Sequence, residues 1–405
     1  MDHESFAALT STDTGRRALV AAQTALAGSD DLLELTDRLR RSFTAELTAA
    51  ALTQAMLRRR AMAKFGSIGQ QMYFTPAGLE QSTRSPVAEL RAQRYAEGGI
   101  GRVADLGCGI GGDMIALARS GLSVLAIERD PLTAAVAAAN AATLGLADRV
   151  EVRRADVTTL DLSQLEVDAV FCDPSRRTGR GQRIFDPEGY QPPWTFLRKL
   201  PAQIPATGIK VAPGIPHRLI PAAAEAEWVS DNGEVKEAVL WFGSLRSSAA
   251  RRATVLPTGA TLIEPTAAAD ATADVPPIGP VAGYLYEPDG AVIRAHLVTQ
   301  LATEIGAHLI DPRLAYLSSD TPVRSPFVSG YRVREVLPFQ LKRLRAALRE
   351  RDIGTVTIKT RGSALDPDRL RRQLRLTGIG STIVILTRID GRPIVILADP
   401  MPAGT

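Results

Sequence analysis

Apolar residues recur at helical spacing through the first 62 residues of the chain, for example at Leu35 and Leu39. Side chains that are three or four residues apart lie on one face of a helix. An alanine-rich stretch at 46–55 favours the same structure, because alanine is the best helix former. A second helical pattern runs from about 76 to 95. The pattern predicts a helical N-terminal region over residues 1–98.

From residue 99 onward, short apolar runs alternate with helical segments. The expected helices cover 113–119 and 131–144, and the expected strands cover 103–106, 124–127, 150–153, 169–172, 209–211 and 237–242. Strands and helices that alternate at this spacing form a parallel sheet with helices on both faces. We therefore predict an α/β domain over residues 99–262.

The remaining chain begins with a low-complexity stretch rich in alanine, threonine and proline, which predicts a linker at 263–280. The C-terminal region, 281–405, contains a β-α-β-α-β-β pattern at about 331–400. Its expected helices cover 338–351 and 366–376, and its expected strands cover 331–337, 355–360, 381–387 and 393–398. This order predicts a separate α+β domain.

Composition excludes several classes of protein. Hydrophobic residues make up 45% and charged residues 23%, a globular balance that excludes a disordered chain. No apolar run is long enough to span a bilayer, and the acidic start of the chain lacks the features of a signal peptide. Two cysteines and four dispersed histidines predict neither a disulfide framework nor a metal site. We expect a soluble, cytoplasmic protein without a membrane segment.

Charge is distributed unevenly along the chain. The net charge is only +4, but residues 324–375 contain 14 Lys and Arg against 5 Asp and Glu, a local +9. Clustered basic side chains can neutralise phosphates, although a solvated helix face has the same pattern. The cluster makes nucleic acid a candidate partner for the C-terminal region.

A glycine-rich turn joins the first expected strand to the helix that follows it. It includes Gly107, Gly109, Gly111 and Gly112, and it is flanked by Asp105 and Asp113. Glycines let the backbone approach a ligand closely, and the helix start presents unpaired N–H groups. The spacing also satisfies G-x-G-x-x-G, so the turn alone does not separate a dinucleotide from another nucleotide-type ligand.

Carboxylates after successive strands separate the two ligand classes. Asp105 would repel a pyrophosphate, whereas it suits an amino group; Glu128 ends the second strand, where an acid can bind ribose hydroxyls. Asp156, followed by Val157, comes after the third strand, and Asp173 ends the fourth. Each acid alone is also typical of a helix cap or turn. Together they favour a zwitterionic ligand that contains adenosine.

These motifs resemble those of class I S-adenosylmethionine-dependent methyltransferases, over roughly residues 64–245. The resemblance implies a Rossmann-like, doubly wound sheet and S-adenosylmethionine as cofactor. It also implies that Asp105 lies near the methionine amino group, Glu128 near the ribose and Asp156 near the adenine. The other cofactor-binding residues that it implies are Gly107, Gly109, Gly111, Asp113 and Val157.

Within that superfamily, the chain resembles trimethylguanosine synthase-like enzymes. The likeness rests on the aromatic-containing segment 73–76, on the second-strand sequence 124–131 and on the final strand at 235–245. The C-terminal block resembles the THUMP-like domain that accompanies such methyltransferases in bacteria. THUMP domains proper bind RNA, so the resemblance implies an RNA substrate.

One motif departs from that family's pattern. Enzymes that methylate amines carry an aromatic residue after Asp-Pro-Pro or a related triplet, whereas this chain has Ser175 after Asp173 and Pro174, followed by two arginines. We expect Asp173 and Pro174 to be catalytic, with Asp173 as hydrogen-bond acceptor or base. The candidate substrate-binding residues are Phe74, Arg176, Arg177 and Trp194, with Tyr73, Phe185 and Tyr190 as further candidates for stacking.

The sequence therefore predicts an S-adenosylmethionine-dependent methyltransferase that acts on RNA, at a base nitrogen of the guanine N2 type. Two alternatives stay open. In the first, the chain is a methyltransferase whose acceptor is a small molecule or a protein. In the second, it is a non-catalytic RNA-binding protein that retains a cofactor pocket.

Overall fold

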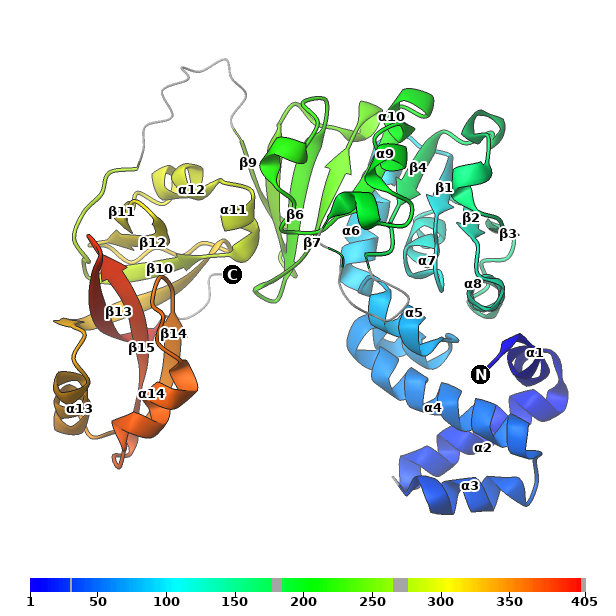
Figure 1. Cartoon of the computed structure of the whole chain (residues 1–405), viewed down its shortest axis with the longest axis horizontal. Coiled ribbons are helices and arrows are strands. Elements are labelled where there is room, and N and C mark those ends of the chain that lie inside the picture. Colours follow the sequence, from blue (N-terminus) through cyan, green and yellow to red (C-terminus); the bar gives the residue numbers. More distant parts are fainter. Residues whose placement is uncertain (30, 177–183, 185, 265–275, 402–405) are drawn as a thin grey trace. The chain divides into compact units, whose positions relative to one another are not determined.

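The computed structural model describes residues 1–29, 31–176, 184, 186–264 and 276–401 (Figure 1). The chain divides into two compact units. The first contains Met1–Glu225 and Val239–Ser247, and the second contains Ala226–Ala238 and Ser248–Thr405. No helix in the described part is long and apolar enough to cross a membrane.

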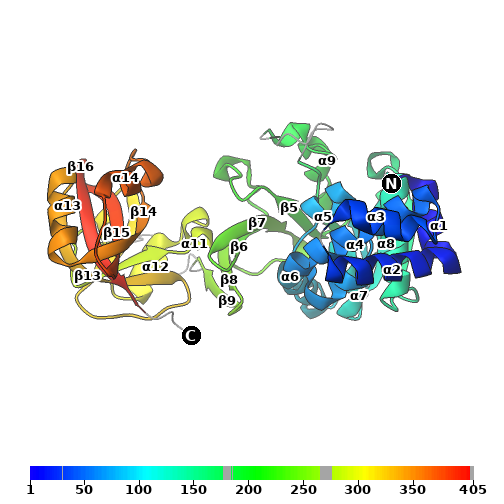
Figure 2. The same ribbon diagram turned by 90° about the horizontal axis from the view of Figure 1, so that it is seen from below.

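The first unit begins with four helices that pack on one another: α1 (His3–Ser11), α2 (Asp13–Gly28), α3 (Leu32–Arg40) and α4 (Ala45–Phe65) (Figure 2). Each helix starts after an Asp or Thr whose side chain accepts a backbone N–H, as in favourable N-caps. A Cβ at Gly15 would lie 2.3 Å from the carbonyl oxygen of Ala8, so α1 and α2 are in close contact. The predicted helical N-terminal region is thus helical throughout this part.

The helix expected at 76–95 is two helices, α5 (Pro76–Gln81) and α6 (Ser85–Glu97), which follow the short helix η1 (Gly66–Gln70). Pro86 is the physical reason for the break. A proline inside a helix lacks the N–H donor and its ring clashes with the carbonyl four residues earlier, here that of Ser82. The expectation of one continuous helix was wrong, and the break creates a turn at residues 82–84.

A parallel sheet is the core of the first unit, with strand order β3-β2-β1-β4-β5. Two helices connect its first three strands, α7 (Gly112–Arg119) and α8 (Pro131–Thr143). The strands are β1 (Arg102–Leu106), β2 (Ser123–Glu128), β3 (Val150–Arg154), β4 (Ala169–Cys172) and β5 (Ala206–Val211). The direction of winding reverses between β1 and β4, and ligands bind open α/β sheets at such a switch point. The predicted α/β, Rossmann-like fold is confirmed.

Short helices connect the later strands of this unit: η2 (Val157–Thr159), η3 (Leu162–Gln164), η4 (Pro187–Gly189), α9 (Trp194–Leu197), α10 (Leu200–Gln203), η5 (His217–Leu219) and η6 (Gly243–Leu245). Strands β6 (Glu225–Asp231) and β7 (Glu234–Trp241) form a hairpin around Asn232 and Gly233. Both turn residues have positive φ, as a two-residue type I′ turn requires.

The second unit continues with strands that the sequence pattern did not resolve. They are β8 (Arg251–Leu256), β9 (Ala260–Ile263), β10 (Tyr284–Pro288), β11 (His308–Asp311) and β12 (Leu314–Ser319), with helices α11 (Gly290–Arg294) and α12 (Val298–Glu304). Most of the expected linker, residues 265–275, lies outside the described residues. The domain boundaries drawn from the sequence stay a prediction.

The C-terminal block has the predicted β-α-β-α-β-β order. Its elements are β13 (Val328–Pro338), α13 (Leu341–Glu350), β14 (Ile353–Thr360), α14 (Pro367–Leu374), β15 (Gly380–Ile389) and β16 (Arg392–Pro400). They belong to a sheet of order β11-β12-β10-β13-β16-β15-β14. Leucines of both helices, including Leu348 and Leu370, pack on Val384 and Val395 of that sheet. The polar sides of α13 and α14 therefore face away from its core.

Candidate active site

Four carboxylates lie at one edge of the sheet of the first unit. Asp105 is next to last in β1, Glu128 ends β2, Asp156 follows β3 and Asp173 follows β4. Because all four strands are parallel, their carboxyl ends meet at the same edge. The structure thus brings together the four acids that the sequence singled out.

The glycine-rich turn after β1 has the conformation that only glycine adopts readily. Gly107, Gly109 and Gly111 have φ of 81°, 58° and 91°, in the left-handed region where a side chain causes strain. The N–H groups of Gly107 and Cys108 both donate to the carbonyl of Ile127, at 2.8 and 3.0 Å. These bonds fold the turn back onto β2 and place it beside the carboxylates.

Asp105 is a buried carboxylate with an unsatisfied oxygen. Asp105 is 1% exposed, and among the described residues its Oδ2 has no hydrogen-bond partner. Burial and the nearby charge of Asp173 raise the pKa of Asp105 to about 7, although Arg91 acts in the opposite direction. An unpaired buried charge is unfavourable, so this oxygen favours a ligand that brings a positively charged donor.

Glu128 and Asp156 are both held by backbone N–H groups. Oε2 of Glu128 accepts from Gly109 at 3.1 Å, and Oε1 accepts from Asp130 at 2.9 Å. Oδ1 of Asp156 accepts from the N–H and hydroxyl of Thr158, and these bonds lower the pKa of Asp156. An ionised carboxylate has about four acceptor positions, so both side chains keep capacity for a ligand's hydroxyl or amine.

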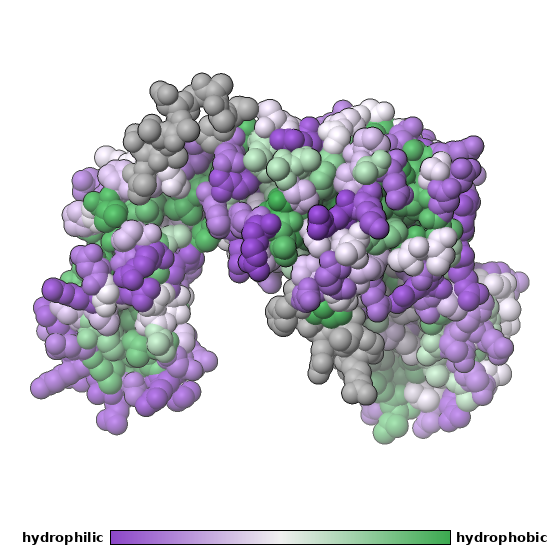
Figure 3. All heavy atoms as spheres, turned by 45° about the horizontal axis from the view of Figure 1, so that its top comes forward, coloured by the Kyte–Doolittle hydropathy of each residue, from purple (hydrophilic) through white to green (hydrophobic). Residues whose placement is uncertain are grey.

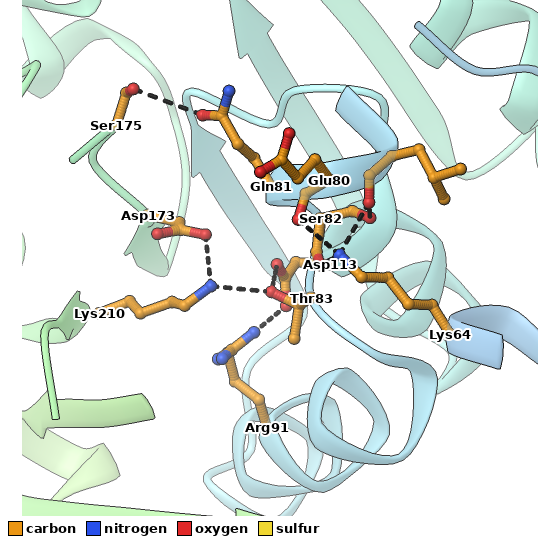
Figure 4. A network of polar contacts seen from close by, with 11 residues as sticks. Lys64, Glu80, Gln81, Ser82, Thr83, Arg91, Asp113, Asp173, Ser175 and Lys210 are labelled. Atoms are coloured by element: carbon orange, nitrogen blue, oxygen red, sulfur yellow. Dashed lines mark hydrogen bonds and ion pairs between the residues drawn. The ribbon is translucent and has the colours of Figure 1, made fainter. Parts of the chain in front are cut away.

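Asp173 is one end of a polar network that crosses the site (Figure 4). Lys210 on β5 donates to Oδ2 of Asp173 at 2.6 Å and to the hydroxyl of Thr83 at 3.1 Å. That hydroxyl donates to Oδ2 of Asp113 at 2.9 Å, and Asp113 is ion-paired with Arg91. The network alternates cations and anions, so each charge in this largely buried region has a partner.

The network gives Asp113 two protein partners within the described residues. Its carboxylate faces Thr83 and Arg91, while the Arg91 guanidinium also lies 4.2 Å from the centroid of the Phe171 ring. These contacts attach the start of α7 to α6 and β4. A direct contact of Asp113 with the cofactor stays a prediction.

The turn that carries Thr83 is fixed by Lys64 of α4. The Lys64 ammonium donates to the carbonyls of Leu79, Glu80 and Ser82, at 2.7, 2.6 and 2.9 Å (Figure 4). A cation suits this position, because the last carbonyls of α5 have no helical partner. The helical region thereby holds Thr83 against the carboxyl end of the sheet.

The segment before α5 contacts the glycine-rich turn directly. Asn140 of α8 donates to the carbonyls of Tyr73 and Ile110, at 3.0 and 2.9 Å, and accepts the N–H of Tyr73 at 2.6 Å. A Cβ at Gly78 would lie 2.3 Å from the Ile110 side chain. The helical region therefore packs against the turn without room for a larger residue.

The chain after Asp173 is only partly described. Pro174 is buried, and Ser175 exchanges two backbone hydrogen bonds with Gln191, at 2.8 and 3.0 Å. Arg176 is half-buried beside this bridge, and Arg177 lies outside the described residues. The arginine pair proposed to clamp a phosphate thus has one described member, which follows Asp173 by three residues.

The aromatic candidates for stacking on a substrate are in the protein interior. Phe74, Tyr190 and Trp194 are 0%, 3% and 4% exposed, and the Phe74 ring packs on Phe65 with centroids 5.7 Å apart. Phe185 lies outside the described residues. Tyr73, a fourth described candidate, is also buried, at 8% exposed. None of these four rings is open to solvent in this conformation, so a stacking role for Phe74 or Trp194 stays a prediction.

Sequence reasoning missed four residues of the site: Lys210, Thr83, Arg91 and Asn140. Lys210 had a recognisable signal, because lysine is rarely buried without a partner and this one lies between Ile209 and Val211 in a buried strand. Thr83 was hidden in the expected helix. Arg91 and Asn140 lie within ordinary helical patterns that gave no signal. Within the described residues, no group of three or more potential ligands could hold a metal ion.

Comparison with known families gives three matches along the chain. Residues 103–177 match a methyltransferase domain, residues 328–400 match a THUMP domain-like family, and residues 2–61 match a domain of unknown function (DUF8688). The second match covers β13 to β16, the block whose order the sequence predicted.

Two curated proteins and one solved structure extend the comparison. An uncharacterized S-adenosylmethionine-dependent methyltransferase of Mycobacterium tuberculosis is 37% identical over 346 residues, 82% of this chain and 91% of that protein. The 23S rRNA (uracil(1939)-C(5))-methyltransferase RlmD of Acidithiobacillus ferrooxidans is 38% identical over 78 residues, 18% of each chain. A crystal structure of a candidate methyltransferase from Porphyromonas gingivalis W83 has the same fold, with a TM-score of 0.76 and 22% identity over 96% of this chain and 99% of that one.

Proposed function

Because this chain belongs to the S-adenosylmethionine-dependent methyltransferases, we propose that it methylates RNA, at a base nitrogen of the guanine N2 type. The cofactor supplies a methyl group on a sulfonium that is transferred by direct displacement. The protein therefore has to align the acceptor with the methyl group and exclude water, and it requires no covalent intermediate.

The acids at the sheet edge suit the parts of S-adenosylmethionine. Asp105 has the unpaired buried oxygen that a positively charged amino group would satisfy. Glu128 accepts hydrogen bonds at the end of β2, where ribose hydroxyls bind in such sheets. We assign Asp156 to the exocyclic amine of adenine and the buried Val157 to the adenine ring. Gly107, Gly109 and Gly111 allow the backbone to approach the ligand, and Asp113 supports this turn through Arg91.

Asp173 and Pro174 are the residues that we assign to the acceptor. The Asp173 side chain is 22% exposed, whereas that of its partner Lys210 is 7% exposed. Asp173 is therefore the member of this ion pair that an acceptor can reach. Its Oδ2 bonds to Lys210, which leaves Oδ1 to accept a hydrogen bond from the N–H of the acceptor. Arg176 is the described candidate for a substrate phosphate or for stacking on a base through its guanidinium plane.

A basic surface on α13 and α14 is the observation that carries the RNA proposal. Seven exposed side chains define this basic helical surface: Lys342, Arg343, Arg349, Arg369, Arg371, Arg372 and Arg375. In Figure 3, purple hydrophilic side chains border a green patch on the C-terminal block, whose helices are labelled in Figure 1. The leucines of the same helices are buried in the THUMP-like core, whereas the basic side chains face solvent and do not pack in that core. Arg371 also pairs with Asp368, at 2.6 Å.

The guanine N2 assignment rests on the resemblance to trimethylguanosine synthase-like enzymes, and the site departs from that family. No aromatic residue follows Asp173 and Pro174, and Phe74, Tyr190 and Trp194 are buried. These observations favour a second candidate, a methyltransferase whose acceptor is a small molecule or a protein and needs no stacking.

Transfer of a radiolabelled methyl group to RNA from cells that lack the protein tests the proposal. We expect incorporation into RNA, and digestion of that RNA to nucleosides identifies the modified base. Cofactor binding without incorporation into any RNA would contradict the proposal, and incorporation into the protein or small-molecule fraction would establish the second candidate.

A further inference from the structure

Lys210 is a buried lysine at the centre of the candidate active site. It lies on β5, is 5% exposed and has its ammonium between Asp173 and Thr83 (Figure 4). The two contacts measure 2.6 and 3.1 Å. Removing an ammonium group from water is costly unless charged or polar partners compensate it. The contacts of Lys210 with Asp173 and Thr83 therefore have to compensate the cost of burying its charge.

The ion pair with Lys210 fixes one carboxylate oxygen of Asp173 and leaves the other oxygen available to a ligand. Oδ2 is the atom that Lys210 contacts, and within the described part of the chain Oδ1 accepts no hydrogen bond. A carboxylate held at one oxygen cannot rotate freely about its Cβ–Cγ bond. The orientation of Oδ1 is therefore determined by Lys210.

Thr83 connects this orientation to the helical region. Its hydroxyl accepts from Lys210 and donates to Asp113, and the turn that carries it is held by Lys64. The Lys210 ammonium is thus positioned from two sides, by β5 on which it lies and by the turn between α5 and α6.

We propose that Lys210 is a positioning residue for methyl transfer, which holds Asp173 so that Oδ1 meets the N–H of the acceptor. The proposal rests on the assignment of Asp173 to the acceptor. Lys210 acts through Asp173 and Thr83, and it contacts neither cofactor nor substrate.

A double-mutant cycle tests this role. We expect Lys210→Met to lower kcat for methyl transfer at least tenfold while the Kd of S-adenosylmethionine, measured by calorimetry above about pH 8 where Asp105 is ionised, changes less than threefold. Lys210→Arg should restore part of kcat, because it keeps the charge. In an Asp173→Asn background, Lys210→Met should cause less than a twofold further loss.

Lys236→Met is the matched control. Lys236 also forms an ion pair, with Glu234 at 2.5 Å, but it lies outside the site, and its variant should keep the wild-type kcat. An unchanged kcat in Lys210→Met, or an equal loss in the Asp173→Asn background, would overturn the proposal. A uniform loss of melting temperature that parallels kcat in every variant would show a merely structural lysine.

A failure of the RNA proposal is distinguishable from a failure of this one. If the wild-type protein transfers no methyl group to RNA, the pH dependence of S-adenosylmethionine binding replaces kcat as the readout. Asp105 senses Asp173, Glu128 and Arg91, so loss of the Lys210 charge should move the midpoint of this dependence upward. We expect that shift in the wild-type background and a smaller one with Asp173→Asn; equal shifts, or none, would overturn the role of Lys210.

Discussion

Asn140 and Tyr73 form a reciprocal pair of hydrogen bonds between α8 and the segment that leads into α5. The amide oxygen of Asn140 accepts the N–H of Tyr73 at 2.6 Å, and its amide nitrogen donates to the Tyr73 carbonyl at 3.0 Å. Asn140 is completely buried and also bonds to the carbonyl of Ile110 in the glycine-rich turn. One side chain therefore connects the helical region to the turn that we assign to the cofactor.

We expect Asn140→Ala to destabilise the protein by about 2–4 kcal/mol, because it leaves buried backbone groups of Tyr73 and Ile110 without partners. The glycine-rich turn should also lose order, so the Kd of S-adenosylmethionine should rise about tenfold, or about 1.4 kcal/mol. Chemical denaturation and calorimetry measure the two effects.

Gln93→Ala is the control for this prediction, since Gln93 is exposed and, among the described residues, its side chain bonds only to Glu97 on its own helix. It should change stability by less than about 0.5 kcal/mol. Equal stability of the Asn140 and Gln93 variants would contradict the connecting role of Asn140.

Gly78→Ala tests the contact between α5 and the turn. The new Cβ would lie 2.3 Å from the Ile110 side chain and 2.7 Å from Oγ1 of Thr75, which caps α5. We expect the variant to lose about 1–3 kcal/mol of stability through overpacking and to bind S-adenosylmethionine less tightly.

The same substitution at Gly28 is the matched comparison. Gly28 ends α2, and a Cβ there would meet no atom within 4 Å. Gly28→Ala should be neutral or slightly stabilising, because alanine is the better helix former. A Gly78 variant as stable and as active in binding as the Gly28 variant would show that α5 does not restrain the turn.

The binding of S-adenosylmethionine should depend on pH through Asp105. Its pKa of about 7 means that the carboxyl is increasingly protonated below neutral pH, and a protonated carboxyl no longer attracts a charged amino group. We expect the affinity measured by calorimetry to be constant above about pH 8 and to fall about tenfold for each pH unit below about 6.

Asp105→Asn should weaken binding at pH 8 and abolish this dependence. The stability of the protein without cofactor should show the opposite sign. The pKa of Asp105 is raised above its model-peptide value of 3.8, so its contribution is most favourable below that value and is lost as the pH rises through about 7. The Asn variant should therefore melt higher than the wild type at pH 8 and similarly at pH 4; a lower melting temperature at pH 8 would contradict the burial argument.

Charge reversal on α14 tests the basic helical surface. The exposed Arg369 and Arg372 are one helical turn apart, and Arg369→Glu with Arg372→Glu should weaken RNA binding at least tenfold. The slope of log K against log salt should also decrease by about 2, one for each lost phosphate contact. A salt titration by filter binding measures both quantities.

Arg38→Glu with Arg41→Glu provides the comparison, because these arginines are exposed with the same spacing on and just after α3. This pair should leave the salt slope unchanged. If both double variants lose affinity equally, the attraction is a general effect of net charge and the assigned surface is wrong.

The secondary structure of the C-terminal block was predictable because each element has a clear local pattern. Leu344 and Leu348 recur at helical spacing in α13, whereas β15 contains the short apolar run Ile383–Leu386. The break before α6 was equally local, since Pro86 prevents a continuous helix, but the apolar periodicity obscured it. The strands β8 to β12 were missed because short runs there lack a distinct period.

The sequence alone determined which residues lie at the carboxyl edge of the sheet. Asp105 and Glu128 lie at the carboxyl ends of β1 and β2, and Asp156 and Asp173 follow β3 and β4 within two residues. Gly107 to Gly111 form one local turn, so no knowledge of packing was needed to place these residues. Strand ends and tight turns depend on residues that are adjacent in the sequence, so the sequence pattern is enough to locate them.

The tertiary structure decided which partners these residues have. Lys210 is 37 residues from Asp173 and 127 from Thr83, and Asn140 is 67 from Tyr73. Contacts over such distances arise only when strands and helices pack, because the same lysine or asparagine in another arrangement would point to solvent or to a different partner. The identity of the acids is therefore a property of the sequence, whereas the charge that balances Asp173 and the bonds that hold the glycine-rich turn are properties of the fold.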